Sequence, residues 1–527
     1  MSSPLRPAAS AEASAALLAQ QAGTELRFAS GQIEQDVRLD GVSLDSRRVL
    51  PGDLYAALPG AHAHGAAFAA QAAAAGAVAV LTDPAGRRIL DEAGVELPRI
   101  VVPDPRAILG RLSARVYRRP ADDLTLIGIT GTNGKTTTAY ILDAALRALG
   151  RTTGLIGTIE TKVADRSIPS ERTTPESPDL HAIFAVMREA QVTEAVMEVS
   201  SHALALHRVD GAVFDVAVFT NLSQDHLDFH RDMEDYFAAK ASLFRPDRAR
   251  RGVVCVDDPW GVRLAAEADV PCWSLATRPD SAGAAQASWR LVSSSPQPPS
   301  SESPAPAAFD LLGPDTALRL VSALPGDYNR INTALAALAL LAIGVEPGDV
   351  ERAMSAGAAV PGRMERIDLP ERAGAPAPTV YVDFAHTPEA VRATLAALRE
   401  MTAGRLIAVL GAGGGRDSAK RPLMGAAAAS GADLVVVTDD NPRDEDPSSI
   451  RAQIVQGARD AGGEVIEVDG RAQAVTRALG LARPGDAVAV LGRGHETYQE
   501  VAGRREPLVD RDLVCDAWSA IGREAGE

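Results

Sequence analysis

The segment Gly131-Thr-Asn-Gly-Lys-Thr-Thr-Thr138 constrains the fold of this chain more than any other feature. It follows an apolar run over residues 124–130 and precedes an Ala- and Leu-rich stretch over 139–149. A strand, a glycine-rich loop and a helix N-terminus in this order form an anion site, because unpaired backbone N–H groups converge on the loop. The segment therefore predicts a strand–loop–helix unit that binds a nucleoside triphosphate.

The residue types in the loop predict how the nucleotide and its metal are held. Lys135 can reach the outer phosphates, and the hydroxyl of Thr136 or Thr137 can hold Mg²⁺. The strict phosphate-loop pattern fails, because Ile129 stands five positions before Gly134 where that pattern has glycine. We therefore expect a shorter variant. Its backbone contacts to the nucleotide come from Gly131, Thr132, Asn133 and Gly134.

A chain of 527 residues is too long for one ordinary domain. Hydrophobic residues make up 46% and charged residues 23%, as is typical of a globular protein with several cores. Short apolar runs alternate with helical patterns, which predicts an α/β fold. We expect a small α/β N-terminal domain over 1–121, a central P-loop-type ATPase domain with a parallel sheet over 122–357, and a doubly wound, Rossmann-like C-terminal domain over 358–527.

The C-terminal region carries its polar residues where its predicted strands end. Strands are expected at 379–383, 406–410, 434–438, 464–468 and 487–491. In a doubly wound sheet, ligands bind at the carboxyl ends of the strands. The segments that follow these strands are therefore expected to line a binding site: 383–386, 411–417, 439–443 and 492–496.

Charge and composition exclude several other classes of protein. A formal net charge of −16 argues against a nucleic-acid-binding protein. No apolar run is long enough to span a bilayer, and the N-terminus lacks a signal peptide, so we expect a cytoplasmic protein without membrane insertion. Three cysteines without paired spacing predict neither a disulfide framework nor a zinc site, and we expect them to be buried. The Ser- and Pro-rich stretch 293–306 predicts a surface insertion without a function of its own.

Two further strand ends carry candidate metal ligands. Glu198 ends an apolar run, where a carboxylate is costly unless it is paired or bound to metal. It could instead cap a nearby helix. The segment 220–230 ends with two carboxylates and two imidazoles within six residues, a set that could also ligate zinc. Beside a phosphate loop and without cysteines, Mg²⁺ or Mn²⁺ is favoured, with His226 as a ligand.

Lys240 lies in the helix-like segment 236–244. Its side chain could simply extend to the surface. Alternatively, a buried Lys240 with a lowered pKa would react with CO₂ and form a carbamate. This second interpretation makes the residue a candidate for modification by carbamylation.

These motifs together resemble the Mur ligases, ATP-dependent amide-bond ligases of peptidoglycan precursor synthesis. The resemblance spans residues 41–512 and continues through the C-terminal region. It is closest to the branch that adds meso-diaminopimelate to a uridine-linked muramoyl dipeptide. The motifs that carry it are 131–138, 198–202, 220–230, 236–240, 328–332, 362–365, 383–388, 413–417 and 492–496.

The resemblance implies a role for individual residues. Catalytic roles fall to Lys135, Lys240, Glu198 and His226, with carbamylation of Lys240 and metal bound by Thr136, Glu198 and His226. Asn329 and Arg363 would contact ATP. Leu44 and Ser46 would bind the uridine end of the substrate, and Thr173, Thr174, Ser200 and Arg208 would bind its muramoyl-dipeptide arm. Leu206 stands two residues before Arg208, where the family often has glutamine, so the resemblance implies no contact from that position here.

The amino-acid donor can also be argued from chemistry. Arg443 follows the strand 434–438, and a guanidinium matches a carboxylate in two hydrogen bonds. Diaminopimelate ends in a second carboxylate, whereas lysine ends in an ammonium that Arg443 would repel. The resemblance assigns the same preference. It implies a donor pocket of Arg416, Asp440, Asn441, Pro442, Arg443, Gly492 and Glu496.

We therefore expect an acyl phosphate to form on the D-glutamate carboxylate at the expense of ATP, followed by attack of the diaminopimelate amine. Closure between the central and C-terminal domains would bring these groups together. The small-molecule partners would be ATP, the muramoyl dipeptide and diaminopimelate, bound to a monomer with Mg²⁺. Three alternatives remain: L-lysine as donor, a folylpolyglutamate-type ligase, and a nucleotide-driven switch without ligase activity.

Overall fold

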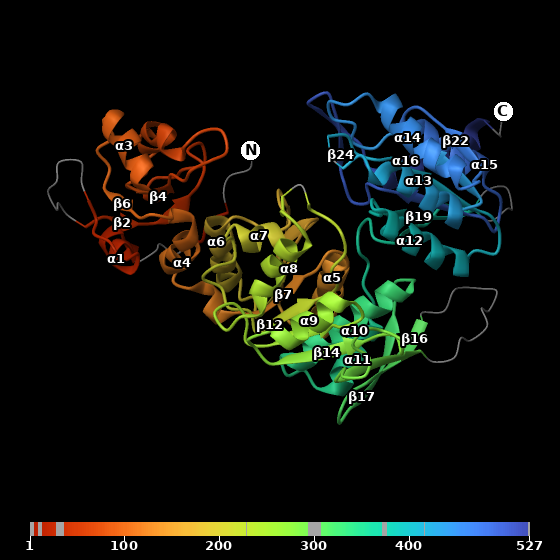
Figure 1. The fold of residues 1–527 in the computed structure, drawn as a ribbon, viewed down its shortest axis with the longest axis horizontal. Coiled ribbons are helices and arrows are strands. Elements are labelled where there is room, and N and C mark those ends of the chain that lie inside the picture. The colour runs from red at the N-terminus through yellow and green to blue at the C-terminus, as the bar shows by residue number, and fades with distance from the viewer. Residues whose placement is uncertain are drawn as a thin grey trace. The chain divides into compact units, whose positions relative to one another are not determined.

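The computed structural model describes residues 5–8, 13–27, 36–227, 229–293, 307–371, 377–415 and 417–524. The chain divides into two compact units. The first consists of 1–292, 310–319 and 334–356, and the second of 293–309, 320–333 and 357–527. Figure 1 shows the chain coloured from its N-terminus to its C-terminus. Each unit is an α/β structure, so the predicted fold class is confirmed.

The N-terminal part of the first unit is a four-stranded parallel sheet in the order β3-β4-β5-β6. Its strands alternate their side chains between two cores. Leu54 and Ala56 of β4 pack with helices α1 and α4, whereas Tyr55 and Ala57 pack with α2 and α3. The bounds are β3 Gly41–Ser43, β4 Asp53–Ala56, β5 Ala79–Thr82, β6 Arg99–Val101, α1 Ala15–Gln21, α2 Ala69–Ala74, α3 Pro84–Glu92 and α4 Pro105–Val116, with a short pair β1 Ala13–Ser14 and β2 Arg38–Leu39.

The central part is built on an eleven-stranded sheet in the order β10-β9-β8-β11-β7-β12-β13-β14-β15-β16-β17. From β8 to β15 neighbouring strands are parallel, and β9 and β10 add an antiparallel edge. The strands are β7 Thr125–Thr130, β8 Thr153–Ile156, β9 Glu160–Val163, β10 Arg166–Pro169, β11 Glu194–Glu198, β12 Val216–Phe219, β13 Gly252–Cys255, β14 Cys272–Ala276, β15 Trp289–Ser293, β16 Ala307–Leu312 and β17 Ala317–Ser322.

Strand β7 lies in the middle of this sheet, between β11 and β12. Five of its six residues are buried, as expected for a parallel strand covered on both faces. The loop after β7 therefore starts from a fixed point in the core. The helices around the sheet are α5 Lys135–Ala148, α6 Ser177–Glu189, α7 Ser201–Ala205, α8 Met233–Ala241, α9 Pro259–Glu267, α10 Asp327–Ala342 and α11 Pro347–Ser355.

The second unit contains a six-stranded sheet in the order β18-β19-β23-β20-β21-β22, parallel except for β18. Helices α12, α13 and α14 cover one face, and α15 and α16 cover the other (Figure 1). This is the predicted doubly wound sheet. Its elements are β18 Glu365–Ile367, β19 Thr379–Asp383, α12 Pro388–Met401, β20 Leu406–Leu410, α13 Lys420–Gly431, β21 Leu434–Val437, α14 Pro447–Asp460, β22 Val465–Glu467, α15 Arg471–Leu481, β23 Ala487–Leu491, β24 Tyr498–Val501, β25 Arg504–Pro507 and α16 Asp510–Glu524.

The three cysteines are free thiols. Cys255 is buried in β13 and Cys272 is half-buried, but Cys515 is exposed on α16, so the prediction that all three are buried is wrong. The reason is the amphipathic character of α16, which turns Val514 and Ala517 towards the core and leaves Cys515 in solvent. Among the described residues, none of the helices combines the length and apolar character needed to cross a bilayer. Residues 294–306, most of the predicted insertion, lie outside the described residues.

Candidate active site

The predicted phosphate loop connects β7 to α5. Gly131 has a φ of 147° and Gly134 a φ of 87°, both in the region that favours glycine. A Cβ atom on Gly131 would collide with the hydroxyl of Thr220, which follows β12. The loop therefore needs glycine at this position for its backbone conformation and for its close approach to the neighbouring strand.

The segment after β12 supports this loop through side-chain hydrogen bonds. The Thr220 hydroxyl donates to the Asn133 carbonyl oxygen at 2.6 Å. The Asn133 N–H donates to the side-chain oxygen of Asn221 at 3.1 Å. The Thr132 hydroxyl lies 3.1 Å from the Tyr236 hydroxyl of α8 and donates to the Ser223 carbonyl. The loop is thus held by the segment after β12 and by α8.

Two lysines converge on this loop. Lys135 Nζ donates to the carbonyl oxygens of Gly131 and Thr132, both at 2.9 Å. Lys240 Nζ donates to the same Gly131 oxygen at 2.8 Å and lies 4.5 Å from the centre of the Tyr236 ring. Lys240 is only 1% exposed, so it does not extend to the surface. Burial, and then the charge of Lys135, place the pKa of Lys240 well below its ordinary value.

A buried carboxylate lies beside the first turn of α5. Glu198 ends β11 and is fully buried. Its oxygens accept hydrogen bonds from the Thr136 hydroxyl at 2.9 Å, the Thr158 N–H at 2.7 Å and the Thr158 hydroxyl at 3.0 Å. Within the described part of the chain, Glu198 forms no ion pair with Lys, Arg or His. A hydroxyl and a buried carboxylate that no cation of the described chain neutralises are ligands that suit Mg²⁺, so the residues fit that cation.

His226 has a left-handed backbone, with a φ of 55°. Its ring meets that of His202 on α7 edge-on at 4.9 Å, and its Nε2 lies 3.5 Å from Asp225. Burial lowers the pKa of His226 to about 4, opposed by Asp225 and assisted by Lys135, so its imidazole is neutral at pH 7. A neutral imidazole is the form that binds metal. Among the described contacts, His226 does not touch Glu198.

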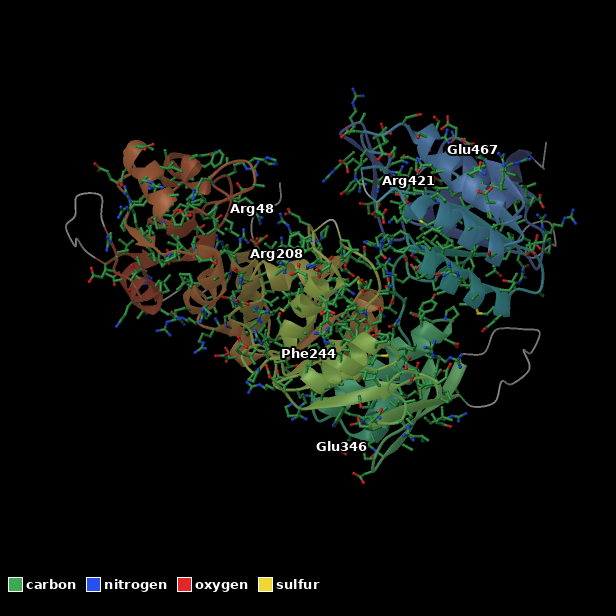
Figure 2. The ribbon with its side chains drawn as sticks, viewed as in Figure 1. Arg48, Arg208, Phe244, Glu346, Arg421 and Glu467 are labelled. Carbon is green, nitrogen blue, oxygen red and sulfur yellow. The ribbon has the colours of Figure 1, made fainter. Side chains whose placement is uncertain are left out.

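The residues predicted for the muramoyl arm lie next to the end of β11, which Glu198 occupies. The Thr158 hydroxyl lies 3.0 Å from that of Thr173. The Thr174 hydroxyl donates to the Glu198 carbonyl oxygen at 2.9 Å and lies 3.3 Å from Ser200 Oγ. Arg208 pairs with Glu176 at 2.8 Å and reaches the Thr174 carbonyl (Figure 2). These four predicted residues are therefore brought together.

Leu44 and Ser46 lie in the loop that follows β3 of the N-terminal sheet. Leu44 is half-buried, and Ser46 Oγ donates to the side-chain oxygen of Gln71 on α2 at 3.0 Å. Arg48 in the same loop, labelled in Figure 2, lies 3.6 Å from Asp179 of α6. The loop thus occupies the carboxyl edge of a parallel sheet, where ligands of such sheets bind.

Asn329 and Arg363 belong to the second unit. The Asn329 amide is used locally, donating to the Pro325 carbonyl at 2.7 Å and accepting from Asn332 at 3.2 Å. The Arg363 guanidinium stacks over the Phe384 ring at 4.2 Å. Arg363 thereby presents a fixed planar cation near the end of β19.

The predicted donor pocket forms where β20, β21 and β23 end side by side. Asn441 Nδ2 donates to Glu496 Oε2 at 2.7 Å. Gly492 has a φ of 110°, and a Cβ there would lie 2.7 Å from Asp440 Oδ2. Burial, and then the charge of Asp440, raise the pKa of Glu496. The carboxylates of Asp440 and Glu496 thus lie close together, with that of Asp440 against Gly492.

Arg443 links the segment 439–443, which follows β21, to the loop that follows β20. It has a φ of 55°, and its guanidinium donates to the Gly414 carbonyl and lies 3.5 Å from Glu500. Gly414 N–H in turn donates to the Asn441 carbonyl at 2.9 Å. Buried Arg421, labelled in Figure 2, secures the same loop through Glu445 at 2.8 Å. Pro442 lies within this turn, and Arg416 lies outside the described residues.

Several residues at these sites were given no individual role from the sequence. Thr158 makes two hydrogen bonds to Glu198, although nothing in its sequence context marks it. His230 is 2% exposed and lies 2.9 Å from Ser201. Arg493 belongs to the motif 492–496 and contacts Asn441 and Glu496. Its place inside that motif was the signal that could have identified it.

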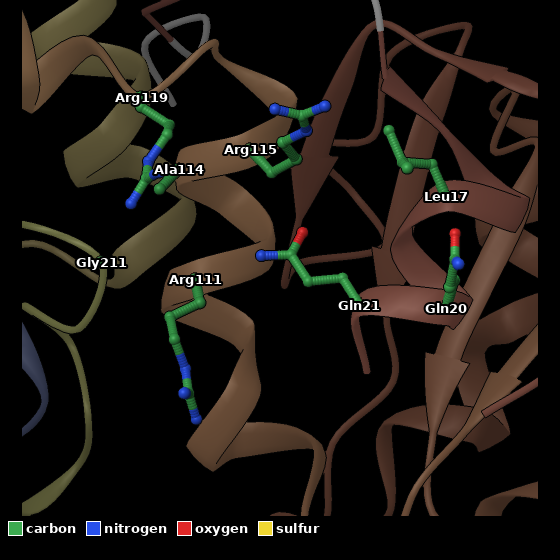
Figure 3. Close-up of a pocket in the computed structure, with 8 residues that line it drawn as sticks. All are labelled: Leu17, Gln20, Gln21, Arg111, Ala114, Arg115, Arg119 and Gly211. Atoms are coloured by element: carbon green, nitrogen blue, oxygen red, sulfur yellow. The ribbon is translucent and has the colours of Figure 1, made fainter. Parts of the chain in front are cut away.

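A cavity of about 330 Å³ also lies in the first unit, between α1, α4 and Gly211 (Figure 3). In this view the side chains of Arg111 and Arg119 extend downward, and the guanidinium of Arg115 points upward. Among the residues that the structure describes, none of those predicted for the site lines this cavity. The cavity is therefore separate from the candidate site.

Comparison with known proteins identifies the family. The Mur ligase family catalytic domain matches residues 38–117, the Mur ligase middle domain 129–341, and the Mur ligase glutamate ligase domain 362–494. The chain belongs to the Mur ligase family, and it is a ligase of peptidoglycan synthesis that forms amide bonds. The predicted resemblance is confirmed.

Individual relatives match over nearly the whole chain. UDP-N-acetylmuramoyl-L-alanyl-D-glutamate--2,6-diaminopimelate ligases from Streptomyces avermitilis and Streptomyces coelicolor are 48% and 49% identical, over 98% of both chains in each case. A solved structure of a ligase with the same name is 31% identical. It covers 92% of this chain and 95% of its own, with a TM-score of 0.62.

Proposed function

We propose that this chain joins meso-2,6-diaminopimelate to the D-glutamate of UDP-N-acetylmuramoyl-L-alanyl-D-glutamate, using ATP. The identity of 48–49% with the two Streptomyces ligases, over 98% of each chain, supports this assignment. The observation that carries it is the donor pocket, which combines Arg443 with two carboxylates, Asp440 and Glu496. A guanidinium suits the distal carboxylate of diaminopimelate, and the carboxylates suit its ammonium. L-Lysine lacks the distal carboxylate.

For the nucleotide, we infer that the backbone of 131–134 and Lys135 bind the phosphates, with further contacts from Asn329 and Arg363. The loop geometry supports this role, because its N–H groups lie at the N-terminus of α5. Thr136, Glu198 and His226 would hold Mg²⁺. When bound, the cation would offset the negative charges of the phosphates and the carboxylate.

For the acceptor substrate, we infer that Leu44 and Ser46 bind the uridine end, and that Thr173, Thr174, Ser200 and Arg208 bind the muramoyl dipeptide. The N-terminal sheet disfavours the folate-ligase alternative, which requires no uridine-binding domain. We propose that the domains span residues 1–121, 122–357 and 358–527. A monomer in the cytoplasm, where ATP and the uridine nucleotide are available, completes the proposal.

The chemistry has two steps. A γ-carboxylate oxygen of D-glutamate bonds to the γ-phosphorus of ATP, and ADP leaves as the bridging P–O bond breaks. The diaminopimelate nitrogen then bonds to the acyl carbon, the phosphate leaves with that carboxylate oxygen, and the nitrogen loses a proton. Lys135 is suited to neutralise charge in the first step. Lys240, as a carbamate, would add a fixed anion beside the loop.

The test is release of phosphate by the purified chain with ATP and Mg²⁺. We expect release only when both the muramoyl dipeptide and diaminopimelate are present. With ¹⁸O in the glutamate carboxylate, one labelled oxygen should appear in the released phosphate. Release that is unaffected by both substrates would instead support a nucleotide-driven switch. Faster turnover with L-lysine than with diaminopimelate would overturn the donor assignment.

A further inference from the structure

Arg493 is a fully buried cation at the end of β23, between the predicted donor residues. Its Nη1 atom donates to Asn441 Oδ1 at 2.9 Å and lies 3.2 Å from Glu496 Oε2. Its Nη2 atom donates to the carbonyl oxygens of Tyr498 at 2.6 Å and Leu508 at 3.3 Å. One guanidinium therefore joins two pocket side chains to the backbone around the hairpin β24–β25.

The contacts of Arg493 fix the orientation of the Asn441 amide. Asn441 Oδ1 faces two donors, the Arg493 guanidinium and the Glu500 N–H at 2.9 Å. A guanidinium and a backbone N–H can only donate, so the amide oxygen must lie on that side. The NH₂ group is then directed at Glu496 Oε2, 2.7 Å away.

Glu496 is held by these groups through one oxygen. Oε2 accepts a hydrogen bond from Asn441 and forms the ion pair with Arg493. Oε1 has no hydrogen-bond partner within the described part of the chain. The Glu496 side chain remains 32% exposed, so a ligand can reach it. Asp440, whose carboxylate borders Gly492, adds a second negative charge to the same place.

We propose that Arg493 is a positioning residue for the amino-acid donor, which orients Asn441 and holds the Glu496 carboxylate aimed at the donor's distal ammonium group. This proposal rests on the proposed function, because it takes the pocket around Glu496 as the donor site. Arg493 itself is buried beneath these side chains and acts through them.

The competing explanation is purely structural, because Arg493 also ties Tyr498 and Leu508 to the end of β23. The two explanations predict different kinetics for variants of Arg493. A structural role affects all substrates and the unfolding temperature together. A positioning role affects the donor alone, since among the described contacts Arg493 touches none of the residues predicted to bind the nucleotide or the acceptor.

The experiment compares Arg493→Met, Arg493→Lys and wild-type full-length protein in steady-state assays that vary each substrate in turn. Arg493→Met removes the charge-assisted hydrogen bonds, so the KM for diaminopimelate should rise roughly tenfold or more, with the KM values for ATP and the muramoyl dipeptide unchanged. Arg493→Lys keeps the positive charge but loses the planar pair of guanidinium donors. Its KM for diaminopimelate should therefore lie between those of wild type and Arg493→Met. In the double variant Arg493→Met/Asn441→Ala, the KM for diaminopimelate should rise by less than the product of the increases in the two single variants.

The pH profile gives a second readout. The charged groups around Glu496 are Asp440, Arg493 and Arg471 of α15. Burial and Asp440 raise the pKa of Glu496, whereas Arg493 lowers it. Without that cation the carboxylate protonates at higher pH, so on acidification the donor KM of Arg493→Met should begin to rise at a higher pH than that of wild type. Arg493→Lys should follow the wild-type profile.

Arg99→Lys is the matched control, because Arg99 is another buried arginine, bonded to Asp91 and to the Val95 carbonyl in the N-terminal sheet. It should leave the donor KM unchanged. An equal rise in all three KM values for Arg493→Met, or an unchanged donor KM, overturns the positioning role. A wild-type protein that does not couple diaminopimelate to ATP would instead refute the proposed function, and the two failures are therefore distinguishable.

Discussion

The Glu198 carboxylate offers the sharpest test of the metal site. Replacing it in Glu198→Gln keeps the shape of the side chain. The amide oxygen can still accept from the Thr158 N–H, and the hydroxyls of Thr136 and Thr158 can rotate to accept from the new NH₂ group. The change therefore removes a charge while preserving the contacts.

The magnitudes follow from this geometry. Three hydrogen bonds to a carboxylate become weaker bonds to a neutral amide, and this loss is offset by the removal of a buried charge, so the free energy of unfolding should change by no more than about 2 kcal/mol. Glu198 is fully buried and no cation of the described chain pairs with it, so removing its charge also removes a desolvation cost. If the carboxylate holds a cation for phosphoryl transfer, kcat should fall roughly 100-fold or more.

The assay follows ADP formation across a Mg²⁺ titration, alongside urea unfolding of the same preparations. Glu160→Gln is the control, since Glu160 is a partly buried carboxylate of β9 that is paired with Lys162 at 3.2 Å. It should keep the wild-type rate. Wild-type turnover and Mg²⁺ dependence in Glu198→Gln would refute the metal site, and a loss of activity that follows a loss of stability would show a structural role instead.

Three other substitutions test the loop and the donor pocket. Lys240→Met should abolish turnover yet stabilise the fold in CO₂-free buffer. The pKa of Lys240 is lowered on folding, so the wild type gains stability as pH rises towards the ordinary lysine pKa, and the advantage of methionine in urea unfolding should be largest at acidic pH. Gly131→Ala should lower the free energy of unfolding by about 2–4 kcal/mol, because of its positive φ and its clash with Thr220. The control Gly150→Ala has a φ of 76° and open space around it, and it should lower that free energy by about 1 kcal/mol in the same urea titration. Arg443→Lys should raise the KM for diaminopimelate about tenfold and leave that for ATP unchanged, and equal effects on both constants would contradict the pocket.

Much of the fold could be predicted because apolar strand segments alternate clearly with helical segments along the sequence. The five C-terminal strands lie within a residue of their predicted limits, and the loop 131–134 connects a strand to a helix as expected. Buried parallel strands are continuous apolar runs, so both their positions and their polar ends can be recognised in a sequence.

The partners within each site could not be predicted, because they come from segments far apart in the chain. Thr158 reaches Glu198 from the turn after β8, and Arg493, after β23, reaches Asn441, after β21, across the one strand β20 between them. The sequence also could not decide between a surface and a buried Lys240, because the surroundings of a helical lysine depend on what packs over its helix. In this fold Lys240 is covered and directed at the loop.

The meeting of two lysines at the Gly131 carbonyl has a consequence for nucleotide affinity. The Nζ atoms of Lys135 at the start of α5 and Lys240 of α8 both donate to the Gly131 carbonyl oxygen, so a phosphate that recruits either lysine must replace one of these hydrogen bonds. Affinity then reflects a difference between two sets of contacts. Chemistry at either lysine, such as addition of CO₂ to one of them, would shift that balance without altering a single atom that touches the base or the ribose.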